Sequence, residues 1–432
     1  MQAYRASLLH FLDDPDRVAE EDSYQYFDDG LLLIEDGKVV EIGHAAELLA
    51  KVPAGVTVTD YADSLIMPGF IDTHVHYPQT EMIAAYGEQL LQWLETYTFP
   101  VESQFSDQEY ARTIADLFLD ELLRCGTTTA LVFGTSHRES VDAFFEACEE
   151  HNLRMIAGKV WMDRNAPDDL TDTADSAYED SKVLIGKWHN RGRLRYAITP
   201  RFAATSSPEQ LRKAGQLLAE HPDVYLHTHM SENPDEVKWV AELFPECENY
   251  LDTYDQAGLL GRRSIFAHCI HLTDSEWDRM AETRSNIAFC PGSNLFLGSG
   301  LFNLQRAVEK NVLVGVGTDV GGGHSFSVLE TLSEAYKVQQ LRSHKLTPFK
   351  AFYLATLGGA RCLDLDDLIG NFSVGKEADF IVLCKAPTPL MQFRLAHCKS
   401  LIEELFVIAM MGDDRTIRAT YVVGKPVHTR SQ

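Results

Sequence analysis

The architecture of this chain can be inferred outward from Met67-Pro68-Gly69-Phe70-Ile71-Asp72-Thr73-His74-Val75-His76-Tyr77-Pro78-Gln79. Pro68 and Gly69 mark the start of the stretch, and an apolar run then leads into His74 and His76. Residues two apart in a β-strand point to the same side, so both imidazoles project from one face. Neutral imidazole is a good zinc ligand, and two of them at the end of one strand supply half of a metal site.

The composition fits a globular protein with an acidic surface. The chain has 432 residues, 45% of them hydrophobic, which is enough for one large domain and a smaller one. Its formal net charge of −26 argues against nucleic acid and anionic membranes as partners. That charge favours a small neutral or weakly charged substrate, or it serves solubility alone. No apolar run reaches 18 residues, so no membrane span is expected.

The cysteine pattern indicates a reducing compartment. Eight cysteines are scattered along the chain, and none stands in a Cys-x-x-Cys pair. The N-terminus carries no recognisable signal peptide. We therefore expect a cytoplasmic protein whose thiols are mostly core residues.

Both ends of the chain are predicted to be rich in β-strands. The N-terminal segment is acidic and irregular to about residue 30, and a β-hairpin then follows over 31–34 and 39–42, around Asp36-Gly37. Short strands are predicted again over 378–383 and 420–423. We expect the two ends to pair into one small β domain, with the rest of the chain inserted between them.

The middle of the chain alternates strands and helices. Strands are predicted over 70–76, 128–133, 155–162, 195–203, 224–229, 265–268, 286–290 and 312–318, and helices over 107–124, 140–151, 208–220 and 234–243. Several helices follow capping residues, namely Ser106, Ser207 and Asn233. Eight such units favour an α/β fold of the (β/α)₈ (TIM) barrel type. An open doubly wound sheet is the alternative, but no Gly-x-Gly-x-x-Gly follows the first strand.

Candidate ligands recur where the predicted strands end. These residues are His74 and His76 on the first strand, His227, His229 and nearby Glu232 on the fifth, His268 on the sixth and Asp319 on the eighth. Barrel active sites lie at the carboxyl ends of the strands. Four or five nitrogen and oxygen ligands from four strand ends can therefore converge on one metal ion.

These motifs resemble the amidohydrolase superfamily, whose members are metal-dependent hydrolases. The match to its deaminase branch rests on 68–76, His229-Met230-Ser231-Glu232 and Gly317-Thr318-Asp319. Within that branch the chain is most similar to the guanine deaminases, through His76-Tyr77-Pro78-Gln79, Thr199-Pro200-Arg201-Phe202, 229–233, 290–294 and 317–322. The family splits a β-sandwich between the chain ends, which here implies residues 1–66 and 373–432 around a barrel of residues 67–372.

The resemblance implies a set of roles for individual residues. It implies one zinc ion per chain, held by His74, His76, His229 and Asp319, and a guanine pocket lined by Gln79, Arg201, Phe202, Glu232 and His268. Guanine would be hydrolysed to xanthine and ammonia. Asp319 would accept a proton from water, Glu232 would protonate the ring nitrogen and then the departing ammonia, and His268 would donate a hydrogen bond. Relatives also suggest a homodimer.

Several residues have competing interpretations. His227 is expected to support the site or pack in the core rather than bind metal, and His268 to donate a hydrogen bond rather than bind metal. Trp93 and Asn294 are expected to pack rather than line the pocket. Binuclear relatives carboxylate a lysine on the fourth strand, whereas Lys159 falls on the third, which favours one metal.

Two other functions remain open at this stage. The same metal site could act on another aminopurine, a pterin or an s-triazine. A protein of this fold that has lost its metal could instead serve as a non-catalytic assembly protein. The zinc nucleoside deaminase motif is excluded, because His137-Arg138-Glu139 is not followed by Pro-Cys-x-x-Cys.

Overall fold

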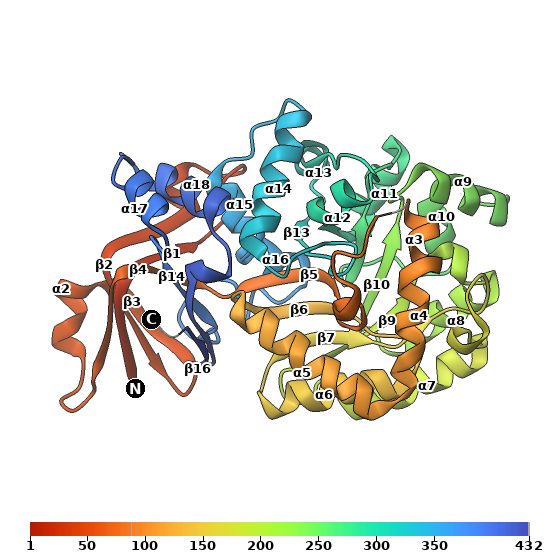
Figure 1. Ribbon diagram of the computed structural model, residues 1–432, viewed down its shortest axis with the longest axis horizontal. Helices are drawn as coiled ribbons and strands as arrows, with labels where there is room; N and C mark the ends of the chain where they lie inside the picture. Colours follow the sequence, from red (N-terminus) through yellow and green to blue (C-terminus); the bar gives the residue numbers. More distant parts are fainter. Residues whose placement is uncertain (88, 431–432) are drawn as a thin grey trace.

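The computed structural model describes residues 1–87 and 89–430, and it contains a barrel beside a smaller sheet (Figure 1). The barrel strands are β5 (Phe70–His76), β6 (Thr127–Phe133), β7 (Arg154–Gly158), β9 (Arg195–Pro200), β10 (Tyr225–Met230), β11 (Ser264–His268), β12 (Asn286–Phe289) and β13 (Val314–Val316). They pair in parallel and in chain order, and the two-residue β8 (Val160–Trp161) pairs with β9.

The eighth strand returns to the first. The backbone N–H of Asp319 donates to the carbonyl of His74 at 2.9 Å, and the N–H of His76 donates to the carbonyl of Val320 at 2.8 Å. The sheet is therefore a nearly closed barrel. This arrangement confirms the predicted (β/α)₈ architecture and excludes the open doubly wound sheet.

Helices cover the outside of the barrel. They are α5 (Gln108–Arg124), α6 (Arg138–Glu150), α7 (Ala174–Trp188), α8 (Pro208–Glu220), α9 (Pro234–Leu243), α10 (Tyr250–Asp255), α11 (Asp274–Thr283), α12 (Pro291–Phe296), α13 (Leu304–Lys310), α14 (Val328–Leu341), α15 (Pro348–Leu354) and α16 (Leu357–Cys362). Ser207 and Asn233 accept hydrogen bonds from the first turns of α8 and α9, as predicted. The cap predicted at Ser106 is wrong. Ser106 ends a 3₁₀ turn, and Asp107 caps α5 instead.

A long connection after β5 carries several short helices before α5 begins. These are η2 (Tyr77–Met82), α3 (Leu90–Trp93), the π-helix η3 (Leu94–Thr98), α4 (Phe99–Glu102) and η4 (Ser103–Ser106). Figure 1 shows α3 and α4 on the same side as the arrowhead of β10, where the barrel strands end. Side chains from this connection therefore reach the mouth of the barrel.

Strands from both chain ends form one seven-stranded sheet. Its order is β16 (Lys425–Thr429), β15 (Ile417–Val422), β14 (Phe380–Cys384), β4 (Val58–Pro68), β1 (Gln2–Phe11), β2 (Tyr24–Glu35) and β3 (Lys38–His44). The C-terminal β14 joins the N-terminal β4 antiparallel, as predicted for the pairing of the two ends. The predicted hairpin is confirmed, because β2 and β3 meet at Asp36 and Gly37, whose φ angles of 50° and 75° fit a type I′ turn.

The expectation of an irregular N-terminus up to residue 30 is wrong. β1 begins at Gln2 and pairs with β2 on one side and β4 on the other, so most of its side chains are buried. The acidic residues that suggested irregular structure begin only at Asp13, between the two strands. The proposed boundaries at 66/67 and 372/373 stay a prediction. Within the described residues, no helix is both long and apolar enough to cross a bilayer.

Candidate metal centre and active site

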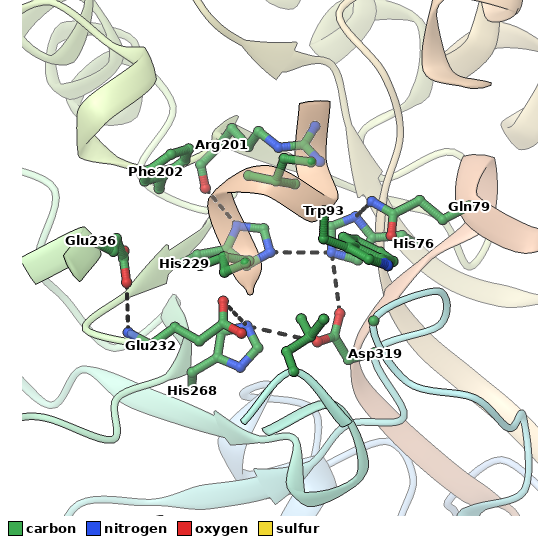
Figure 2. A pocket seen from close by; sticks show the side chains of 14 residues that line it. His76, Gln79, Trp93, Arg201, Phe202, His229, Glu232, Glu236, His268 and Asp319 are labelled. Carbon is green, nitrogen blue, oxygen red and sulfur yellow. Dashed lines mark hydrogen bonds and ion pairs between the residues drawn. The ribbon is translucent and has the colours of Figure 1, made fainter. Parts of the chain in front are cut away.

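A pocket opens at the carboxyl ends of the barrel strands (Figure 2). It is lined by His76, Gln79, Leu90, Trp93, Leu94, Arg201, Phe202, His229, Glu232, Glu236, His268, Leu297, Asp319 and Gly322. Every residue predicted from the sequence for metal, catalysis or substrate is in this list except His74. His74 is fully buried directly beside the pocket.

Three imidazole nitrogens and one carboxylate oxygen converge beside this pocket. His76 Nε2 lies 3.2 Å from both His74 Nε2 and His229 Nε2. Asp319 Oδ1 lies 3.2 Å from His74 Nε2 and 3.4 Å from His76 Nε2. Ligands about 2.0–2.1 Å from a tetrahedral zinc ion stand roughly 3.3 Å apart, so the spacing fits such an ion.

The charge state of this cluster also fits a cation. Burial lowers the pKa of His76 to about 4, and it lowers the pKa of His229 well below its usual value. Burial alone would raise the pKa of Asp319, but the neighbouring His74 and His76 hold it well below its usual range. The ring nitrogens are thus neutral beside a carboxylate, which is the state in which these groups bind metal.

Contacts behind the candidate ligands fix the orientation of their rings. His229 Nδ1 donates to the carbonyl of Arg201 at 2.6 Å, which leaves its Nε2 lone pair facing the cluster. His74 Nδ1 lies 2.7 Å from His227 Nε2. Such supporting contacts orient metal-binding imidazoles.

Glu232 and His268 face the cluster from the other side. His268 Nε2 lies 3.4 Å from Glu232 Oε2 and 3.7 Å from Asp319 Oδ2, while its Nδ1 contacts Asn294 Oδ1 at 2.9 Å. Burial, and then the charge of Asp319, raise the pKa of Glu232 to about 8. Ser299 donates to the other carboxylate oxygen of Glu232 at 3.0 Å. The carboxyl of Glu232 is therefore suited to carry a proton near neutral pH.

The polar groups predicted to bind the substrate lie on the side of the pocket opposite Glu232 and His268. Arg201 is 2% exposed and donates to both carboxylate oxygens of Glu102, at 2.7 and 3.1 Å. Gln79 Oε1 accepts from the backbone N–H of Gly321 at 3.2 Å. Phe202 adds an apolar wall to the pocket. Figure 2 shows Arg201 and Phe202 together above the cluster, with Gln79 beside His76.

Comparison with known proteins places this architecture in a family. Residues 65–427 match the amidohydrolase family. The chain belongs to the amidohydrolase family. It is 55% identical to the guanine deaminase of Escherichia coli (strain K12) over 434 residues, covering 100% of this chain and 98% of the relative. The predicted resemblance to the guanine deaminases is therefore confirmed.

Solved structures of guanine deaminases superpose closely on this chain. The E. coli guanine deaminase structure matches with a TM-score of 0.98 at 55% identity, over 100% of both chains. The C. acetobutylicum guanine deaminase with guanine bound in its active site matches with a TM-score of 0.89 at 27% identity, over 99% of this chain and 100% of that one.

Within this amidohydrolase, the count of barrel strands confirms the predicted place of Lys159. Lys159 directly follows β7, the third strand, whereas the fourth, β9, ends at Pro200 beside Arg201. The Lys159 ammonium is buried and pairs with the carboxylate of Asp172. It therefore serves an internal ion pair.

Two residues expected only to pack, Trp93 and Asn294, and one that the sequence did not single out, Glu236, lie in or beside the pocket. Trp93 packs in the core, as predicted, yet it also lines the pocket. Asn294 is buried and reaches the site through His268. Glu236 accepts hydrogen bonds from the backbone N–H groups of Glu232 and Asn233 at 2.8 and 3.1 Å. A Glu three residues after a capping Asn signals such a capping box.

Proposed function

We propose that this chain is a zinc-dependent guanine deaminase, which hydrolyses guanine to xanthine and ammonia. The observation that carries the proposal is one pocket in which a His-Asp metal-binding set lies between Glu232 and the polar pair Gln79 and Arg201. The full-length similarity to a guanine deaminase at 55% identity supports the choice of substrate.

The metal in this proposal is one zinc ion per chain. His74, His76, His229 and Asp319 would hold it, since four of the distances among their ligand atoms are 3.2–3.4 Å, as in a tetrahedral site. A bound zinc ion supplies Lewis-acid chemistry and an acidified water near neutral pH. His268 lies within 4.8 Å of ligand atoms of His74 and His229, on the substrate side, and acts as a hydrogen-bond donor rather than as a metal ligand.

Protein side chains manage the protons of the reaction. Asp319 accepts one proton from the attacking water, whose oxygen bonds to the ring carbon that bears the amine. Glu232, with its raised pKa, gives its proton to the adjacent ring nitrogen. Glu232 then takes the remaining proton of the added hydroxyl and delivers it to the amine, so that the carbon–nitrogen bond breaks, the oxygen becomes the new carbonyl and ammonia leaves. The proton held by Asp319 finally returns to Glu232. His268 donates a hydrogen bond toward the attacking oxygen.

The opposite wall recognises the base. Arg201 and Gln79 provide hydrogen-bonding groups for the carbonyl and nitrogens of the purine, and Phe202 covers its face. Such a site discriminates strongly against analogues that leave its polar groups unpaired. The proposal extends to a cytoplasmic homodimer that serves purine catabolism, and light scattering at low protein concentration tests the dimer.

Identification of the products tests the proposed reaction. Protein with a measured zinc content is incubated with guanine, the purine product is identified by chromatography, and ammonia is assayed in parallel. We expect equimolar xanthine and ammonia, loss of both after chelation, and recovery with zinc. Zinc-loaded protein that leaves guanine unchanged would contradict the proposal.

A further inference from the structure

Glu102 is the common contact of the two polar groups that line the recognition wall. Arg201 Nη1 and Nη2 donate to its Oε2 and Oε1 at 2.7 and 3.1 Å, and Gln79 Nε2 donates to the same Oε1 at 3.1 Å. Glu102 is 0% exposed and is the last residue of α4. It does not itself line the pocket, so it acts on a bound molecule through Gln79 and Arg201.

The carboxylate of Glu102 neutralises a buried guanidinium. Removing one partner of a buried ion pair leaves an uncompensated charge in a poorly solvated place. The only salt bridge recorded for Arg201 among the described residues is the one to Glu102. The ring of Phe99, from the same short helix, lies 5.4 Å below the guanidinium carbon. Helix α4 thus fixes both the charge and the plane of Arg201.

Glu102 also determines which way the Gln79 amide faces. A carboxylate accepts only, so the amide end 3.1 Å from Glu102 is the donating nitrogen. At the other end, the backbone N–H of Gly321 donates to Gln79 Oε1 at 3.2 Å. The two contacts together fix the donor and acceptor ends of an amide that would otherwise rotate.

We propose that Glu102 is the positioning residue that makes this pocket select a neutral heterocycle over an anionic one. This inference rests on the proposed function, in which Gln79 and Arg201 contact the base. With Glu102 in place, the Arg201–Glu102 ion pair has no net charge, and Arg201 still offers its remaining N–H donors to the base. Without the Glu102 carboxylate, the same guanidinium becomes an unpaired cation that attracts anions.

A charge-removing variant tests the proposal in the zinc-loaded protein. Binding of hypoxanthine, a neutral purine, and of urate, a purine monoanion at neutral pH, is measured by calorimetry for the wild type and for Glu102→Gln. We expect the ratio of urate to hypoxanthine affinity to rise by roughly tenfold or more in the variant, since an ion pair with Arg201 replaces the lost one. Adding Arg201→Met to Glu102→Gln should abolish that gain.

Glu377 offers a matched control outside the pocket. It is another acid paired with buried arginine, in this case two, accepting from Arg154 Nε at 2.9 Å and Arg193 Nη2 at 2.7 Å. Glu377→Gln should lower thermal stability, as Glu102→Gln does, but leave the affinity ratio unchanged. An unchanged ratio in folded, zinc-loaded Glu102→Gln would overturn the proposal, as would an equal rise in Glu377→Gln.

The test separates this inference from the proposed function. Guanine turnover by the wild type is measured first. Absence of guanine turnover would contradict the proposed function. The ratio of urate to hypoxanthine affinity would still test the role of Glu102. If Glu102→Gln does not fold, Glu102→Asp replaces it, because it keeps the charge but draws the carboxylate back by one methylene. The proposal then requires a several-fold rise in KM for guanine at unchanged zinc content, and an unchanged KM refutes it.

Discussion

His227 Nε2 lies 2.7 Å from His74 Nδ1, and both rings are completely buried. Burial, and to a smaller extent the neighbouring His74 and His76, lower the pKa of His227 well below its usual value, so its ring is neutral. In the proposed metal-binding state, in which His74 Nε2 faces the metal and Asp319, His74 Nδ1 carries the proton and donates to His227 Nε2. The two histidines that stand two apart on β10 therefore have different roles. His229 faces the cluster, and His227 supports the candidate ligand His74 from behind.

Replacing His227 should weaken metal binding without removing a ligand. We expect His227→Leu to lower zinc affinity by about 10–100-fold, which is typical when a supporting contact of a ligand is lost. Competition with a coloured chelator measures this affinity. The exposed His397→Ala is the control and should bind zinc like the wild type. Wild-type zinc affinity in His227→Leu would show that the His227 ring only packs against His74 and does not support metal binding.

Glu232→Gln should keep the metal and lose most of the turnover. The amide preserves the size of the side chain but cannot pass a proton, so we expect kcat to fall by about 10²–10⁴-fold. Zinc content by elemental analysis and kcat for guanine are measured on the same sample. The exposed Glu282→Gln serves as control. Retained activity in Glu232→Gln would remove it as the proton carrier.

Arg201→Ala should impair substrate use and stability together, with zinc retained. The substitution leaves Glu102 buried and unpaired, which costs about 3–5 kcal/mol of unfolding free energy. The metal is expected to stay because His229 Nδ1 bonds to the backbone carbonyl of residue 201, which the substitution preserves. Thermal melting, kcat/KM and zinc content report the three effects. Parallel loss of zinc would show that the Arg201 side chain supports the metal site.

His10 should make the protein sensitive to acid. It is 2% exposed, its Nδ1 accepts from the N–H of Phe372, and burial lowers its pKa from 6.5 to about 4. Because the unfolded chain takes up the proton first, stability is full above pH 6.5 and is lost as pH falls toward 4. The loss amounts to about 3 kcal/mol.

Urea unfolding of the wild type and His10→Gln across this pH range measures the effect. The stability advantage of the wild type should shrink by that amount between pH 6.5 and 4. A constant difference between the two proteins would instead show that the pKa of His10 is the same in the folded and unfolded states.

The barrel and the convergence of the candidate ligands could be predicted because their signals are local. His74 and His76 follow strand periodicity, and His229, His268 and Asp319 stand where apolar runs end. Parallel strands bring such ends to one edge whatever the details of packing. The cap at Asp107 was misplaced by one residue because Ser106 is an equally good capping type.

Other parts of the site depend on contacts that the sequence does not encode locally. Glu102 is 99 residues from Arg201, and nothing near it marks a binding residue. Trp93 lies in a connection of short helices whose path over the barrel mouth follows no periodicity. Strand β1 was missed because the acidic run at Asp13 obscured it, although β1 itself is largely apolar.

The central claim is that this pocket deaminates guanine in preference to other amines. The most direct measurement is kcat/KM of the zinc-loaded protein for guanine, adenine, cytosine, a pterin and an s-triazine, followed by ammonia release. The account predicts that kcat/KM for guanine exceeds that for each of the other amines by at least about 10³-fold, because a wrong base leaves the polar groups of Gln79 and Arg201 unpaired. Faster metal-dependent turnover of any other amine would contradict this claim. It would support the metal site but assign it a different substrate.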